Sequence, residues 1–296
     1  MKALTTLALS TGLAASAMAA TTINSVNKFS YGANIGWMDW RGDVTSGAVI
    51  GEFICTGSIY GANVGWISLG SGTPANGIRY QNNSAADYGV NHDGLGNLRG
   101  YAYGANIGWL TFTNRDATGA FYEGPKVDLL TGKMNGFVWS ANCGWISLSN
   151  QFAFVQTDKI QMGGDSDGDG IPDAWELLKF GNLTTANGTS DRDGDGFSDL
   201  SEYLADTDPT DPNSNLRITA YSADPGGSPA KIEWTSVASR LYHIQKRTNL
   251  NPGSLWSDVG LGLISPDAGA TTTRDFIDPA SPQRFFRIEA IKPLSP

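Results

Sequence analysis

Histidine and cysteine, the residues most often used as general bases and nucleophiles, are scarce in this chain of 296 residues, which has two of each. His92 lies in the turn "NHDGLG" and His243 in the strand-like run "LYHIQ", far apart in the sequence. Cys143 has no histidine close to it, which argues against an activated thiolate. These absences predict a protein that is not an enzyme.

Basic residues are also few, with 20 Lys and Arg against 29 Asp and Glu. The acid is concentrated, because the segment from Asp165 to Asp211 holds thirteen acidic residues and only two basic ones, and the rest of the chain is close to neutral. A nucleic-acid partner would need a basic stripe, so we do not expect one. The local excess of carboxylates indicates a site for divalent cations.

Long apolar runs are confined to the N-terminus, where Lys2 precedes "ALTTLALSTGLAASAM" and the run ends in Ala17-Met18-Ala19. This pattern is typical of a cleaved secretory signal, so we assign residues 1–19 to a signal peptide. No later run approaches the ~20 apolar residues of a membrane span. We therefore expect an exported protein, either extracellular or at the cell surface, without a membrane span.

The two cysteines of an exported protein can pair. Cys55 lies in a strand-like run and Cys143 in a turn, and both positions are predicted to be buried. A bridge between them would contribute roughly 4 kcal/mol in the chain-entropy model. Two inert buried thiols fit the sequence equally well, so both possibilities stay open.

Two twelve-residue segments have the pattern of a calcium loop: "DSDGDGIPDAWE" at 165–176 and "DRDGDGFSDLSE" at 191–202. Each has Asp at positions 1, 3, 5 and 9, Gly at 6 and Glu at 12, as in the EF-hand loop, in which position 7 contributes a backbone carbonyl. We expect about two calcium ions. The predicted ligands are Asp165, Asp167, Asp169, Ile171 (carbonyl), Asp173 and Glu176 in the first loop, and Asp191, Asp193, Asp195, Phe197 (carbonyl), Asp199 and Glu202 in the second.

The pattern departs from a full EF-hand, because Gly163-Gly164 stands where the entering helix would be. With the helical runs "AWELLKFGN" and "LSEYLADTD" and the tail "TDPTDP", the segment resembles the dockerin-like and thrombospondin type 3-like calcium repeats of secreted bacterial proteins. The resemblance implies a structural calcium segment over residues 162–214. Positions 10 and 11 differ between the loops, so we do not expect the cohesin docking of a true dockerin.

A seven-residue motif occurs four times within residues 20–161. The copies are "YGANIGW" at 31–37, "YGANVGW" at 60–66, "YGANIGW" at 103–109 and "WSANCGW" at 139–145. The surrounding residues alternate and are rich in Val, Tyr, Phe and Trp, which predicts antiparallel strands joined by tight turns. We expect the motif's Asn to satisfy backbone groups inside its own turn and its second Gly to allow positive φ.

The first copy lacks a leading strand, whereas "QFAFVQTDKI" at 151–160 is a strand without a follower. Circular closure of four units, as in the latch of a β-propeller, explains both observations and hides the sheet edges. An open stack with frayed ends is the alternative.

Alternation assigns the motif tryptophans to one face and the apolar neighbours that follow them to the other. The tryptophans are Trp37, Trp66, Trp109 and Trp145. The neighbours are Met38, Trp40, Ile67, Leu69, Leu110, Phe112, Ile146 and Leu148. Either the sheets are covered on both faces and the tryptophans pack between units, or the tryptophans form an exposed ring that stacks on sugars.

The run "GYAYGANIGWLTF" resembles the "GYAWSENIGWINF"-type repeats of exported bacterial surface proteins. This resemblance spans roughly residues 22–160 and implies a β-repeat domain without catalytic residues.

Residues 215–296 contain short alternating runs with turn residues between them, which predict a small β-sandwich. The stretches "IEWTSVASRLYHIQKRTNL" and "RFFRIEA" resemble a fibronectin-III-like or immunoglobulin-like domain of exported bacterial proteins, which implies a spacer or a targeting module.

Taken together, the sequence predicts a mostly β, modular, non-catalytic protein that binds calcium and acts in adhesion, in matrix building or in glycan recognition. Its partners would be glycans or other surface and matrix proteins. The competing hypothesis is a secreted carbohydrate-active enzyme with a pair of carboxylates hidden in the repeat domain. The candidates for that pair are Asp39, Asp93, Glu123 and Asp128.

Overall fold

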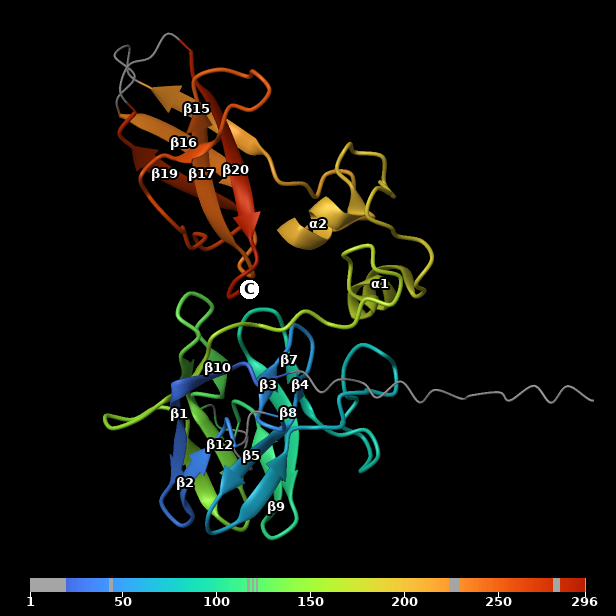
Figure 1. Ribbon diagram of the computed structural model, residues 1–296, viewed down its shortest axis with the longest axis vertical. Coiled ribbons are helices and arrows are strands. Elements are labelled where there is room, and N and C mark those ends of the chain that lie inside the picture. The colour runs from blue at the N-terminus through green and yellow to red at the C-terminus, as the bar shows by residue number, and fades with distance from the viewer. Residues whose placement is uncertain are drawn as a thin grey trace, which may run out of the picture.

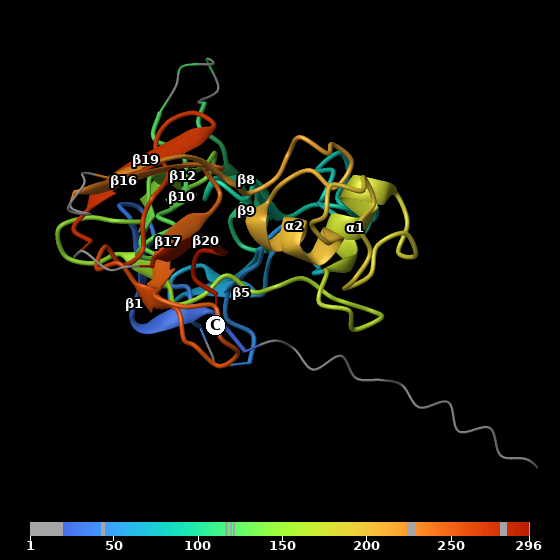
Figure 2. The same ribbon diagram turned by 90° about the horizontal axis from the view of Figure 1, so that it is seen from above.

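The computed structural model describes residues 20–42, 45–115, 118, 120, 122–223, 229–278 and 283–295. These residues form a β-barrel, a segment with two short helices and a C-terminal pair of sheets (Figure 1). The helices lie to one side of the barrel (Figure 2). The predicted signal peptide, residues 1–19, lies outside the described residues. None of the helices in the described part of the chain is both long and apolar enough to cross a membrane.

Eight strands follow one another around a closed antiparallel barrel. They are β1 (Ile23–Gly32), β2 (Gly36–Asp39), β5 (Ser58–Gly61), β6 (Gly65–Ser68), β8 (Leu98–Gly104), β9 (Gly108–Phe112), β12 (Phe137–Ser140) and β13 (Gly144–Ser147). The ring closes where β13 pairs with β1, with Tyr31 opposite Ser147 and Gly32 opposite Ile146. Each copy of the motif forms the turn of one hairpin.

Closure is therefore present, but the propeller that we expected is not formed. A propeller blade needs about four strands of its own, whereas each motif copy contributes one hairpin to the barrel. The four hairpins pair edge to edge around the barrel, so none of their edge strands is left unpaired. The strand after the last copy, β14 (Val155–Thr157), also pairs with β1, which places the two ends of the repeat domain side by side.

The inward face of the barrel is the apolar face that alternation predicted. The eight neighbours of the motif tryptophans, from Met38 to Leu148, are at most 2% exposed and belong to one hydrophobic cluster. Short ladders extend this core at the end of the barrel away from the motif turns. They are β3 (Val49–Ile50), β4 (Cys55–Thr56), β7 (Val90–His92), β10 (Lys126–Val127) and β11 (Met134–Asn135).

A ring of asparagine side chains links the four motif turns. Each amide donates to the backbone carbonyl of the residue after the motif Asn in the neighbouring turn: Asn63 to Ile35 at 3.1 Å, Asn106 to Val64 at 3.1 Å, Asn142 to Ile107 at 2.9 Å and Asn34 to Cys143 at 3.2 Å. The expectation that each Asn serves its own turn was wrong. The accepting residues are buried and fill this end of the barrel.

The glycine that follows these buried residues has a left-handed backbone in every copy, with φ between 72° and 81°. A Cβ atom added there would lie 3.3–3.5 Å from the amide nitrogen of the neighbouring asparagine. Glycine is therefore needed for both its φ and the close approach of the next turn.

The acidic segment forms two helices, α1 (Asp173–Phe180) and α2 (Asp199–Ala205), each beginning at position 9 of a loop. Residues 162–172 contain no helix, as Gly163-Gly164 predicted. Ile171, Trp175, Ala186 and Tyr203 form a small core of their own.

The C-terminal part has two three-stranded antiparallel sheets. One contains β15 (Ile218–Ala223), β16 (Ala230–Thr235) and β19 (Thr271–Phe276), and the other β18 (Ser257–Asp258), β17 (Leu241–Arg247) and β20 (Phe285–Ile291). Side chains from both sheets share one apolar cluster, which includes Ile232, Trp234, Tyr242 and Ile244. The fibronectin-III-like identity stays a prediction.

Both cysteines are free and buried. Cys55 lies on β4 at one end of the barrel, and Cys143 lies in a motif turn at the other (Figure 1). Burial raises the pKa of the Cys55 thiol to about 12, so it stays protonated and unreactive at neutral pH. Of the two possibilities left open by the sequence, the structure contains the pair of buried thiols.

The asparagine ring makes a testable contribution to stability. Asn106→Ala removes one side-chain donor and leaves the Val64 carbonyl without it. We expect a loss of about 1 kcal/mol in the free energy of unfolding, measured by urea denaturation with calcium present. The control is Asn83→Ala, because Asn83 is exposed and lies outside the ring. Equal stabilities of the two variants would contradict the role of the ring.

His92 gives a second prediction. It is 1% exposed, its Nδ1 lies 3.0 Å from the Gly51 carbonyl oxygen, and burial lowers its pKa below the usual 6.5. The unfolded chain therefore binds a proton below pH 6.5 that the folded chain does not, and stability falls as the pH falls. With calcium in excess, His92→Asn should show a shallower loss of stability between pH 6.5 and 5. His243→Asn should keep the steeper profile of the unaltered chain.

Candidate calcium sites and aromatic surface

The first three Asp residues of each loop converge on a common point. One carboxylate oxygen from each of Asp165, Asp167 and Asp169 lies within 4.8 Å of the others, and the same holds for Asp191, Asp193 and Asp195. The position-1 carboxylate shapes each loop, since Asp165 accepts from the Gly168 and Gly170 N–H groups at 2.8 and 3.0 Å. Asp191 repeats both distances with its own two glycines.

The glutamates at position 12 are buried carboxylates without enough partners. Glu176 and Glu202 are each 1% exposed. Both oxygens of Glu176 and Oε2 of Glu202 have no hydrogen-bond partner among the described residues, while Oε1 of Glu202 accepts from the Thr207 hydroxyl at 3.1 Å. A buried carboxylate without partners is costly, and a cation bound at this point would remove most of that cost.

Burial and the neighbouring carboxylates also raise the pKa of both glutamates. Burial, followed by the charge of Asp169, raises the pKa of Glu176 to about 7. Burial also raises the pKa of Glu202 to about 7; the hydrogen bond from Thr207 opposes this shift, and the charge of Asp193 adds to it. Hard oxygen ligands, a loop that bends at Gly and a position-12 carboxylate with free oxygens are the donor set that calcium prefers. The residues of both loops therefore fit calcium.

The position-9 aspartates accept hydrogen bonds from residues near the start of their own loops. Asp173 accepts from the Ser166 N–H at 2.8 Å and from the Ser166 hydroxyl at 2.5 Å. Asp199 likewise accepts from the Arg192 N–H at 3.1 Å and the Ser190 hydroxyl at 2.5 Å. Each carboxylate thus holds the start of its loop against its helix, and its direct ligation of calcium stays a prediction.

The two loops are not paired through their position-7 side chains. Ile171 is buried in the small core, whereas Phe197 is 38% exposed. In a paired EF-hand the two side chains would meet. Ligation by the carbonyls of Ile171 and Phe197 stays a prediction.

The family of these loops follows from comparison with known proteins. Residues 165–181 and 191–212 match the bacterial TSP3 repeat. The match covers both loops, both helices and the "TDPTDP" tail, and we call residues 165–212 the TSP3 segment. TSP3 repeats are calcium-binding elements of the extracellular type. Of the two resemblances given for this acidic segment, the thrombospondin type 3-like one is confirmed. Neither the curated proteins nor the solved structures gave a match to the chain.

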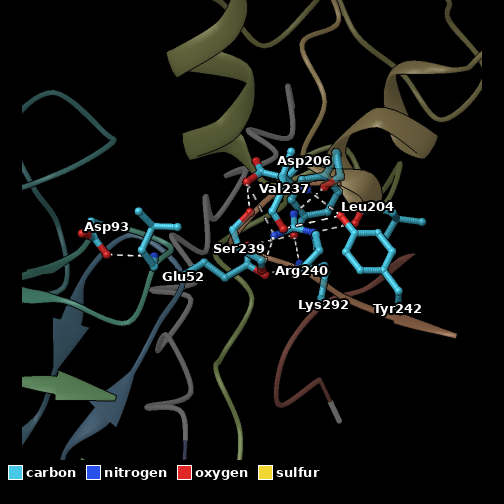
Figure 3. A network of polar contacts seen from close by, with 11 residues as sticks. Glu52, Asp93, Leu204, Asp206, Val237, Ser239, Arg240, Tyr242 and Lys292 are labelled. Carbon is cyan, nitrogen blue, oxygen red and sulfur yellow. Dashed lines mark hydrogen bonds and ion pairs between the residues drawn. The ribbon is translucent and has the colours of Figure 1, made fainter. Parts of the chain in front are cut away.

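Helix α2 of the TSP3 segment contacts both neighbouring parts of the chain (Figure 3). The Tyr203 hydroxyl donates to Glu52 of the barrel at 2.8 Å, and Lys292 of the C-terminal part contacts both of these side chains. Arg240 donates to the Leu204 and Tyr203 carbonyls at 2.6 and 2.7 Å. Tyr203, which follows the predicted ligand Glu202, is therefore the residue at which the barrel, the TSP3 segment and the C-terminal part meet.

The motif tryptophans lie on the outer wall of the barrel and are 42–47% exposed. Each lies opposite an aromatic residue of its own hairpin. We call these eight residues the aromatic belt: Tyr31, Trp37, Tyr60, Trp66, Tyr103, Trp109, Trp139 and Trp145. In the first three hairpins the ring centroids are 4.8–4.9 Å apart. Of the two arrangements considered for the tryptophans, packing between covered units is not formed, because a single barrel leaves its outer face open.

Sequence reasoning missed residues that widen the belt. Tyr88 packs against Trp109 with centroids 4.9 Å apart, and Tyr122 packs edge-on against Trp145 at 4.6 Å. Both lie outside the repeated motif, so no periodic signal identifies them. The junction residues Glu52, Tyr203 and Arg240 were missed for the same reason.

The calcium assignment predicts a specific loss of binding. Glu176→Gln and Glu202→Gln each remove one position-12 carboxylate, and each should abolish or weaken by at least about tenfold one of two calcium-binding events. Isothermal titration of the intact chain measures both. Glu123→Gln, which changes an exposed carboxylate outside the loops, serves as the control. Two unaltered binding events in the double variant would refute the assignment.

Proposed function

We propose that this is an exported, non-catalytic binding protein whose aromatic belt recognises neutral glycans at a cell surface or in an extracellular matrix. The TSP3 segment, with calcium, would fix the barrel relative to the C-terminal part. The exposure of Trp37, Trp66, Trp109 and Trp145, 42–47% each, is the observation that carries the proposal.

The chemistry of the belt supports a carbohydrate ligand. Exposed aromatic surface of this extent marks interaction sites, and flat rings offer a face to the C–H groups of a sugar. Small hydroxyl side chains alternate with the rings on the outward face, at Ser68, Thr111 and Ser147. The charged residue Asp39 on this face is paired with Lys28 at 2.7 Å. A surface of this kind suits a neutral ligand.

The arrangement also supports multivalent binding. The four hairpins follow one another around the closed barrel, so their tryptophans face outward in different directions. Several chains of a polysaccharide, or several branches of one, could then be held at once. Weak individual sites gain strength in this way through their effective concentration.

Export and anchoring complete the proposal. The N-terminal sequence pattern and the extracellular character of TSP3 repeats support export. The two C-terminal sheets that share one core support a β-sandwich of the fibronectin-III-like kind, acting as spacer or targeting module.

The competing hypothesis of a carbohydrate-active enzyme finds less support. Three of its candidate carboxylates are already engaged by neighbouring residues. Asp39 forms an ion pair with Lys28. Asp93 accepts hydrogen bonds from the Leu95 and Asn97 N–H groups, and Asp128 accepts from those of Leu130 and Thr131. Incubation of the purified chain with polysaccharides, followed by an assay for released reducing ends, tests it. Sustained turnover would replace the binding proposal with the enzymatic one.

Tryptophan substitutions test glycan recognition. Trp66→Ala and Trp109→Ala each remove one platform of the belt, and the double variant should reduce retention on insoluble cellulose, chitin or mannan by about tenfold or more because avidity multiplies the losses. Trp256→Ala is the matched control, because Trp256 belongs to the C-terminal part, where its ring contacts the Arg247 and Arg287 guanidinium groups. Equal retention of the double variant and the control would contradict the proposal.

A further inference from the structure

We propose that the barrel has a distinct subsite for one or two sugar units beside its fourth hairpin, built from a polar ladder and the edge of the aromatic belt. This inference deepens the proposed glycan recognition and rests on it. The subsite is a concavity of about 390 Å³, which lies in the size range of small-ligand sites. Its lining includes Asn97, Arg99, Asn114, Tyr122, Lys126 and Asn135.

Strand register brings the polar side chains into one row. Lys126 on β10 is paired with Asn135 on β11 and, by an isolated bridge, with Asn97. Directly paired residues of antiparallel strands project from the same face. Their sequence neighbours Leu98, Val127 and Met134 are 0% exposed and point into the core. The row therefore forms the outward face of a ladder whose inward face is rigidly packed.

The row has hydrogen-bonding capacity that the protein itself does not use. The side chains of Asn114 and Asn135 are half-buried and have no hydrogen-bond partner among the described residues. Arg99 is held in place through Nη1, which donates to the Leu98 and Pro125 carbonyls at 2.7 and 3.2 Å. Its Nε and Nη2 groups make no hydrogen bond within the described part of the chain. Amides and a fixed guanidinium are groups that can bind adjacent hydroxyls.

The charges of the concavity balance. The lining contains two basic residues, Arg99 and Lys126, and two acidic residues, Glu123 and Asp128, so neither an anion nor a cation is favoured. On one side stands Tyr122, whose ring packs edge-on against Trp145 at 4.6 Å. Balanced donors and acceptors next to an aromatic wall match a neutral pyranose, which has a hydroxyl-rich edge and an apolar face.

The free polar row is not repeated in the ladders of the second and third hairpins. In the third, Asn91 is paired with Arg99, but the Asn91 side chain already accepts from the Tyr80 N–H and donates to the Tyr80 carbonyl, both at 2.9 Å. The corresponding ladder of the second hairpin, β3 with β4, pairs Val49 with Thr56 and Ile50 with Cys55, and it has no comparable polar row. In both ribbon views β10 lies on the side of the barrel away from α1 (Figures 1 and 2).

The test uses the intact chain with calcium and four neutral probes: cellohexaose, chitohexaose, maltohexaose and mannohexaose. Isothermal titration identifies the best of them, and its affinity is then measured for Asn135→Ala, Asn114→Ala, Trp66→Ala and the control Asn83→Ala. Loss of one or two net hydrogen bonds predicts about a three- to tenfold weaker affinity for each of the first two variants. The control should bind like the unaltered chain, and circular dichroism verifies that every variant is folded.

The outcomes separate this inference from the proposed function. Weaker binding by Asn135→Ala and Asn114→Ala, with the control unchanged, supports the subsite whatever Trp66→Ala does. Weaker binding by Trp66→Ala alone overturns the subsite and leaves the aromatic belt as the glycan surface. Absence of binding to all four probes overturns the subsite, and the polysaccharide retention assay then decides the proposed function separately.

Discussion

The pairing of β13 with β1 is the constraint on which the rest of the structure depends. Eight strands of at most ten residues, several of them only four residues long, would be marginal as an open sheet. Closure removes both free edges and encloses one hydrophobic core. It also sends the second face of every hairpin outward, so the aromatic belt follows from the same pairing. The asparagine ring closes in the same way, because the hydrogen bond from Asn34 to the Cys143 carbonyl joins the first motif turn to the fourth.

Much of this could be read from the sequence. The four motif copies, their alternation and the two loops predicted the hairpins, the inward residues and the acidic segment correctly. The choice between propeller and barrel could not be read, because alternation is the same in a blade and in a barrel wall. It is decided by pairing between residues more than a hundred positions apart, such as Tyr31 and Ser147. The hydrogen bonds that Asp173 accepts from Ser166 could not be predicted either, since a residue at position 9 of such a loop can have several roles.

The junction of the three parts shows the same limit. Glu52, Tyr203, Arg240 and Lys292 come from four distant segments, and each is unremarkable in its local sequence. Tyr203, at which these residues meet, directly follows Glu202 in α2. The predicted calcium ligand of the second loop and the residue that contacts the barrel and the C-terminal part are therefore consecutive.

A cross-link across the seam tests closure most directly. In a chain with Cys55→Ala and Cys143→Val, the substitutions Tyr31→Cys and Ser147→Cys place two thiols on directly paired residues of β1 and β13. A closed barrel forms an intramolecular disulfide rapidly under mild oxidation, seen as a faster-migrating monomer on a non-reducing gel. Free thiols after oxidation, or disulfides only between chains, would show an open stack of hairpins and contradict closure.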